Sequence, residues 1–129
     1  MALANAFSIL CFCAAMCAPA QDAKTPVVAC NLKAISATER PRYNELMKRL
    51  RTAVRERSEL PDGYDFRLDG NAITLREVAD WISLERLCCP FLNFQLFASG
   101  SQSNWVLKLT GPTGVKALLQ EEFPATPRR

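Results

Sequence analysis

The chain contains no histidine, and this absence excludes several kinds of catalytic and metal site. Ser-His-Asp and Cys-His catalysis both depend on an imidazole that accepts a proton, and many zinc sites use imidazole as a ligand. The sequence also lacks a Gly-rich phosphate loop, an aromatic RNA-binding motif and a repeat of about 20–50 residues. Its net charge of +3 is too small to indicate nucleic-acid binding. We therefore expect no nucleic-acid partner.

Charge is absent from residues 1–20, an apolar segment that ends in Ala18-Pro19-Ala20. An apolar run followed by small residues at alternate positions is typical of a secretory signal peptide, although no Lys or Arg precedes this one. The alternative is an uncleaved membrane anchor, because about 20 apolar residues are needed to span a bilayer. We predict cleavage after Ala20 and export, with the periplasm as the destination and no stable membrane span in the mature chain.

Cleavage at that position would leave the mature chain with Cys30, Cys88 and Cys89. An odd number of cysteines in an oxidising compartment leaves either one free thiol or a three-thiol site. The sequence has no Cys-x-x-Cys spacing, and this argues against a thioredoxin-like oxidoreductase. A thiol-redox enzyme is therefore the third of our functional interpretations.

The length is sufficient for one domain and not for two. Composition and turn residues divide the chain into a signal peptide at 1–20, a linker at 21–29, a single domain at 30–123 and a disordered tail at 124–129.

The first predicted helix follows Thr38, which we expect to cap it, and ends at the turn formers Leu60-Pro61-Asp62-Gly63. Its apolar residues follow the i, i+3, i+4, i+7 spacing of one helix face. These residues are Tyr43, Leu46, Met47, Leu50 and Val54, and three arginines, Arg51, Arg55 and Arg57, lie near the expected C-terminal end.

A second helix is predicted from Thr74 to the Cys-Cys-Pro sequence, with a capping box formed by Thr74 and Glu77. Its expected apolar side consists of Leu75, Val78, Ala79, Ile82 and Cys89, flanked by Trp81, Leu84 and Cys88.

Alternation of apolar and polar residues predicts strands at 64–68, 91–98 and 104–110, and a last short helix carries Val115, Leu118 and Leu119 inward. The element order is α-β-α-β-β-α. We predict a small two-layer α+β domain in which a three-stranded antiparallel sheet is covered on one face by helices.

The adjacent thiols of Cys88 and Cys89 lie where a helix ends, because Pro90 cannot continue it. Three interpretations are open. Either cysteine packs as a small apolar residue, or Cys30 forms a structural disulfide with Cys88 or Cys89, or two or three thiolates bind a soft metal ion. Three thiolates suit Hg(II), As(III) or Cu(I) better than Zn(II). Glu85, one turn earlier, is either an added oxygen ligand or an ordinary solvent-facing or capping residue.

Thiol reactivity at this position is opposed by the helix itself. The C-terminal end of a helix carries partial negative charge and disfavours a thiolate, although Arg86 offsets part of this effect.

Three motifs connect residues 30–123 with a family of small bacterial proteins. They are the strand start from Leu60 to Phe66, the sequence from Trp81 to Phe91 that contains Glu-Arg-x-Cys-Cys-Pro-Phe, and the closing segment from Leu109 to Lys116. With Cys30 before the first helix, the chain resembles this family. Similar Cys-Cys-Pro-Phe segments accompany mercury-resistance-type regulators, and the resemblance therefore implies heavy-metal chemistry at Cys30, Cys88 and Cys89.

We predict a small exported protein that binds a soft metal or metalloid ion through cysteine thiolates. The alternative is a non-enzymatic structural or interaction module with a disulfide from Cys30 to Cys88 or Cys89. The sequence identifies no protein partner.

Overall fold

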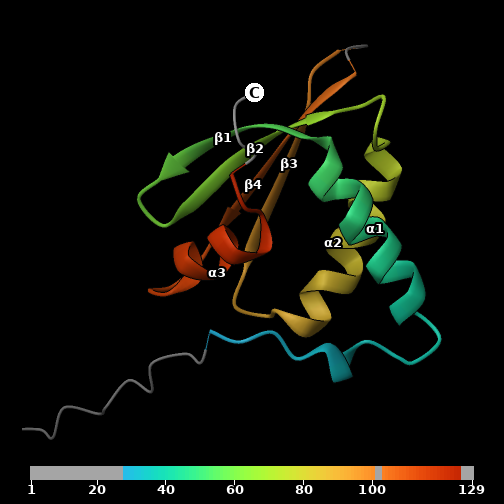
Figure 1. The fold of residues 1–129 in the computed structure, drawn as a ribbon. Helices are drawn as coiled ribbons and strands as arrows, with labels where there is room; N and C mark the ends of the chain where they lie inside the picture. The colour runs from blue at the N-terminus through green and yellow to red at the C-terminus, as the bar shows by residue number, and fades with distance from the viewer. Residues whose placement is uncertain (1–27, 101–102, 126–129) are drawn as a thin grey trace, which may run out of the picture.

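The computed structural model describes residues 28–100 and 103–125. The elements, in chain order, are η1 (Leu32–Ala34), α1 (Arg40–Ala53), β1 (Val54–Leu60), β2 (Gly63–Asp69), α2 (Leu75–Cys88), β3 (Asn93–Ala98), β4 (Asn104–Thr110) and α3 (Val115–Glu122). Figure 1 shows α1 and α2 side by side, with the segment that precedes α1 passing beneath the C-terminal end of α2.

The strands form one antiparallel sheet in the order β1-β2-β4-β3. All three α-helices pack on the same face. In α2, Trp81 contacts Phe94 of β3, and Phe123, at the end of α3, contacts Phe66 of β2. The paired residues Tyr64, Leu109 and Phe94 share this face, and Gln120 of α3 donates a hydrogen bond to the hydroxyl of Tyr64. The predicted α+β class and the helix-covered sheet are confirmed.

The core lies between the sheet and the helices, where large apolar side chains from every layer are removed from solvent. The largest fully buried ones are Trp81, Phe66, Ile35, Leu46, Leu50, Leu68, Ile73, Leu107, Leu109, Leu119, Val78 and Val115. The alternation of Leu107 and Leu109 in β4 is as the sequence predicts.

The prediction of a three-stranded sheet is wrong, because the sheet has a fourth strand. Residues 54–60 form β1 and do not continue the first helix. Val54, Arg57 and Leu60 are the less exposed residues of this strand, and their three-residue spacing imitates a helix. Tertiary contacts override that local preference. Arg57 lies over the ring of Tyr64 on β2, and its guanidinium donates to the carbonyl of Phe123.

The start of α1 also differs from the prediction, since its N-cap is Glu39 and not Thr38. A turn comes first, in which the carbonyl of Ser36 accepts hydrogen bonds from the N–H groups of Glu39 and Arg40.

The predicted capping box of α2 is confirmed, with Thr74 and Glu77 bonded reciprocally. The buried face of the helix is different, however. Leu75 and Ala79 are exposed, whereas Glu85 is buried along one line with Val78, Trp81 and Cys88. A search for apolar residues alone misses this line because it contains a carboxyl group, and only the helical spacing of Glu85 from Trp81 and Cys88 indicates it.

Strand β3 begins at Asn93, two residues later than predicted, and Ala98 is exposed at its end. The predicted signal peptide at 1–20 lies outside the described residues, as do residues 21–27 of the linker and 126–129 of the tail. None of the helices within 28–100 and 103–125 is long and apolar enough to cross a membrane.

Removal of the α2 cap should destabilise the domain. In Thr74→Ala, the Glu77 N–H loses its side-chain acceptor, and we expect a loss of about 1 kcal/mol of unfolding free energy. Urea denaturation measures this loss. Thr113→Ala, an exposed threonine before α3, is the control and should have little effect. Equal stabilities of the two variants would contradict a stabilising role for the cap.

Candidate thiol site at the end of helix α2

The site begins at the corner where α2 ends. Cys88 is the last helical residue, and Cys89 is the C-cap, whose N–H donates to the carbonyl of Glu85 at 2.8 Å. Pro90 prevents a further turn because it has no N–H and restricts the backbone of Cys89. The N–H of Leu92 donates back to the carbonyl of Cys89 at 3.1 Å, so that the chain turns sharply into β3.

A distant segment, the one before α1, brings the third cysteine to this corner. The N–H of Asn31 donates to the carbonyl of Cys88 at 2.9 Å. The side chain of Ile35 is fully buried, and its carbonyl accepts a hydrogen bond from the guanidinium of Arg40. Backbone bonding and apolar burial thus hold the segment next to Cys30 against the end of α2, in addition to any bond between sulfurs.

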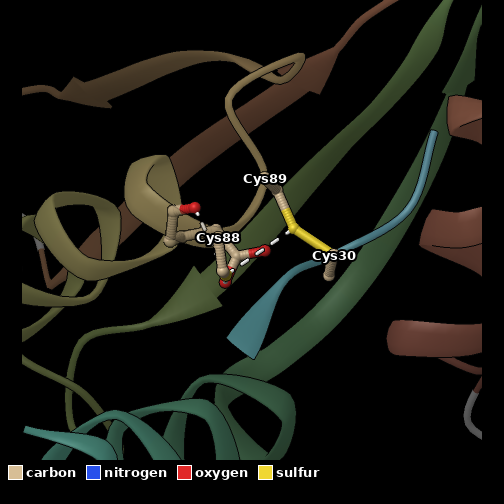
Figure 2. Close-up of side chains that lie close together, drawn as sticks. Cys30, Cys88 and Cys89 are labelled. Atoms are coloured by element: carbon tan, nitrogen blue, oxygen red, sulfur yellow. Dashed lines mark hydrogen bonds between the residues drawn. A yellow bond between two sulfur atoms is a disulfide. The ribbon is translucent and has the colours of Figure 1, made fainter. Parts of the chain in front are cut away.

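Cys30 and Cys89 form a disulfide, with their Cα atoms 4.9 Å apart and 59 positions apart in sequence. Figure 2 shows the bridge with Cys88 beside it. The sequence left open whether Cys88 or Cys89 would pair, and the structure pairs Cys89. Cys88 is a free thiol and, like Cys89, has no solvent-exposed surface.

The free thiol of Cys88 lies among three possible hydrogen-bond partners. Its sulfur is 3.7 Å from the sulfur of Cys89, 3.4 Å from the backbone carbonyl oxygen of Glu85 and 3.6 Å from the Oε2 atom of the same residue. One thiol hydrogen can satisfy only one of these partners at a time. The disulfide and the free thiol thus form one sulfur cluster, in which Cys88 and Cys89 are buried and Cys30 is half-buried.

Glu85 is the one charged side chain that is buried in the described part of the chain, with 3% of its surface exposed. Its Oε2 atom accepts a hydrogen bond of 2.8 Å from the hydroxyl of Tyr43 on α1. A buried carboxyl needs such a partner, because an unpaired polar group in the interior is costly. The Tyr43–Glu85 bond therefore fixes α1 against the end of α2.

Burial determines the protonation of this cluster. It raises the pKa of the Cys88 thiol to about 12, with a further contribution from the neighbouring Glu85 carboxylate. Burial likewise raises the pKa of Glu85, while the hydrogen bond from Tyr43 acts in the opposite direction. Burial and then the Glu85 charge raise the pKa of Tyr43. At neutral pH Cys88 is accordingly a thiol and a weak nucleophile.

The predicted site residues Cys30, Cys88 and Cys89 are brought together, and Glu85 joins them. The potential ligand atoms of these four residues all lie within 4.8 Å of one another. Sequence reasoning weighed Glu85 as an oxygen ligand but missed Tyr43, which it assigned only to an apolar stripe. The position of Glu85 on the same helical line as Trp81 and Cys88 was the signal for its burial.

No protein-family model, curated protein or solved structure matches the chain. The resemblance to the small bacterial proteins described above therefore stays a prediction.

Loss of the disulfide should weaken the fold substantially. The bridge closes a loop of 59 positions, for which loop-entropy models give about 4 kcal/mol of stabilisation. Oxidised Cys30→Ser should unfold at a correspondingly lower urea concentration. Cys88→Ser retains the bridge and is the matched control. Equal stabilities of Cys30→Ser and Cys88→Ser would show that the bridge contributes nothing.

The raised pKa of Glu85 should make stability depend on pH. The carboxyl group of Glu85 holds its proton more tightly in the native protein than in the unfolded chain, where its pKa is about 4.5. The free energy of unfolding should therefore fall as pH rises from about 4.5 through the native pKa. Glu85→Gln keeps an oxygen that accepts from Tyr43 and should lack this fall.

Urea denaturation of the oxidised protein at a series of pH values from about 4 to about 8 measures the effect. Glu121→Gln, which alters an exposed glutamate on α3, should keep the pH profile of the parent protein. A parallel profile for Glu85→Gln would mean that the carboxyl does not titrate differently on folding.

Proposed function

We propose that the protein binds one thiophilic metal or metalloid ion through Cys30, Cys88 and Cys89 after the Cys30–Cys89 disulfide is reduced. The observation that carries this proposal is the convergence of the ligand atoms of these cysteines and of Glu85 within 4.8 Å. The three cysteines come from two segments that are distant in sequence, and the fold brings their sulfur atoms into one cluster.

Reduction and metal binding are separate steps. Reduction adds two electrons and two protons to the disulfide and yields the thiols of Cys30 and Cys89. The Asn31–Cys88 backbone bond and the buried Ile35 keep Cys30 near the corner afterwards. The three-thiol site therefore needs little further ordering, and less entropy is lost when an ion binds.

The donor set favours soft ions. Sulfur ligands select Hg(II), As(III) or Cu(I), and three thiolates complete the coordination that As(III) and Hg(II) accept. Zn(II) needs a fourth ligand, for which Glu85 is the available oxygen donor. Because burial raises the pKa of Cys88 to about 12, an incoming ion must displace its proton, and binding releases protons to solvent.

The proposal includes export. A disulfide is expected in an oxidising compartment such as the periplasm. There the oxidised bridge would keep two of the three sulfur ligands out of metal coordination, and a reductant would be required for binding. The resemblance to proteins with Cys-Cys-Pro-Phe segments supports heavy-metal chemistry on separate grounds.

A structural or interaction module is the second candidate function. The disulfide itself favours it, since the bridge ties the segment before α1 to the end of α2 and stabilises a small domain. In that case the buried thiol of Cys88 only fills space in the core. A thiol-redox enzyme is disfavoured by the raised pKa of Cys88.

Metal titration distinguishes the candidates. The test uses the full chain with Cys11, Cys13 and Cys17 replaced by serine. After reduction it should bind one Hg(II) or As(III) per chain, with ultraviolet sulfur-to-metal bands for Hg(II). The oxidised form should bind far more weakly, because two of its sulfurs are in the bridge. Affinity should decrease as pH falls.

Matched variants identify the ligands. Cys88→Ser and Cys89→Ser should each weaken Hg(II) binding severely, and Cys30→Ser separates two-thiol from three-thiol coordination. Glu85→Gln should leave Hg(II) binding nearly unchanged but weaken binding of Zn(II). Equal Hg(II) affinity of the parent and the Cys88→Ser/Cys89→Ser double variant would refute the proposal and leave the structural role.

A further inference from the structure

A cavity of about 350 Å³ lies between α1 and the segment before it, and Cys30 of the disulfide is one of its lining residues. Its volume is at the low end of the range for small-molecule sites. The lining residues come from the segment before α1, from α1 itself and from the end of α3, and they are Cys30, Leu32, Tyr43, Asn44, Met47, Lys48, Arg51 and Glu122. The cavity therefore has room for a small molecule.

Of the two bridged cysteines, only Cys30 borders the cavity. Cys30 is half-buried and lines the cavity, whereas Cys89 is completely buried and does not. In thiol–disulfide exchange the attacking thiolate must reach the sulfur atom that it attacks. An external thiol therefore meets the sulfur of Cys30 first, and the sulfur of Cys89 is the leaving group.

The walls of the cavity carry two cations and one carboxylate. Arg51 is paired with Glu122 at 2.8 Å, while Lys48 is exposed and forms no ion pair within residues 28–100 and 103–125. Lys48 therefore contributes an unpaired positive charge to the cavity that Cys30 also lines. A positive potential attracts an acidic molecule and also favours the thiolate form of its sulfur.

We infer that this cavity binds a small thiol that carries an acidic group, and that it directs the thiol to the sulfur of Cys30 to open the disulfide. The aliphatic and aromatic parts of Leu32, Tyr43 and Met47 supply the apolar wall, and Lys48 supplies the charge that selects the acid.

The reaction takes place in two exchanges. The thiolate attacks the sulfur of Cys30, a mixed disulfide forms there, and the Cys30–Cys89 bond breaks with its electron pair passing to Cys89, which then takes a proton. A second thiolate attacks the external sulfur of the mixed disulfide and releases Cys30 as a thiol. In sum, two small thiols are oxidised to their disulfide and the protein bridge is reduced to two thiols.

The small thiol would be the reductant that the proposed metal site requires. Only this consequence rests on the proposed function. The reduction test contains no metal, so either proposal can fail without the other.

Reduction rates measure the selectivity. The oxidised full chain, again with Cys11, Cys13 and Cys17 replaced by serine, is reduced under identical conditions by 2-mercaptoethanesulfonate, 2-mercaptoethanol or cysteamine, which are acidic, neutral and basic thiols. Each rate is divided by the rate with an uncharged reference, 2-hydroxyethyl disulfide, to remove differences in thiol pKa. At low ionic strength the acidic thiol should react fastest with the protein, and cysteamine slowest.

Charge reversal at the cavity provides the matched comparison. Lys48→Glu should lower the ratio of the acidic to the basic rate about fourfold, the effect expected for two charge units several ångströms away in partly screened solvent. Arg76→Glu makes the same change on an exposed residue at the opposite end of α2, about 18 Å along the helix from Cys88, and should leave the ratio unchanged.

Peptide mapping after an acid quench locates the first attack. The small thiol should be found on Cys30. Its attachment to Cys89, or equal rate ratios for Lys48→Glu and Arg76→Glu, would overturn the inference. The inference would also be overturned if a dithiol protein reduced the bridge while the small thiols reduced it no faster than they reduce the reference disulfide. That result would indicate a protein reductant.

Discussion

Burial of Glu85 at the end of α2 is the constraint on which the thiol corner depends. A carboxyl group inside the domain must have a hydrogen-bond partner, and the hydroxyl of Tyr43 on α1 is that partner. The bond fixes the two helices relative to each other at the position where α2 ends. Cys88 shares the buried face with Glu85, and its thiol is consequently held inside, next to the carboxyl group.

The same corner receives the segment before α1. The carbonyl groups at the end of a helix lack partners within the helix, and the N–H of Asn31 satisfies the carbonyl of Cys88. This backbone bond places Cys30 one residue away, where its sulfur meets the sulfur of Cys89. The choice of Cys89 over Cys88 follows from the helix. The side chain of Cys88 is directed to Glu85, and the C-cap residue Cys89 is left to pair.

Most of the fold was predictable because local signals agree with tertiary packing. The capping box of Thr74 and Glu77 marks α2, and alternation marks β4. Strand β1 was not predictable, because its Arg- and Glu-rich sequence shows a helical spacing and its strand form depends on pairing with β2. The sequence singles out Cys88 and Cys89 because Pro90 must end the helix there. Cys30 follows as the third cysteine of the predicted mature chain. The pairing of Cys30 and the role of Tyr43 could not be predicted, because both depend on contacts between segments that are distant in sequence.

The disulfide and the proposed metal site would use the same sulfur atoms and therefore exclude each other. While Cys30 and Cys89 are bonded, only Cys88 retains a thiol, and burial raises its pKa to about 12, so that it is protonated at neutral pH. Reduction would change the number of available sulfur ligands from one to three, and the buried Ile35 and the Asn31–Cys88 bond would still hold the backbone next to Cys30. One redox step at the half-buried Cys30 would thus decide whether the domain holds a covalent bridge or a soft ion at the same position.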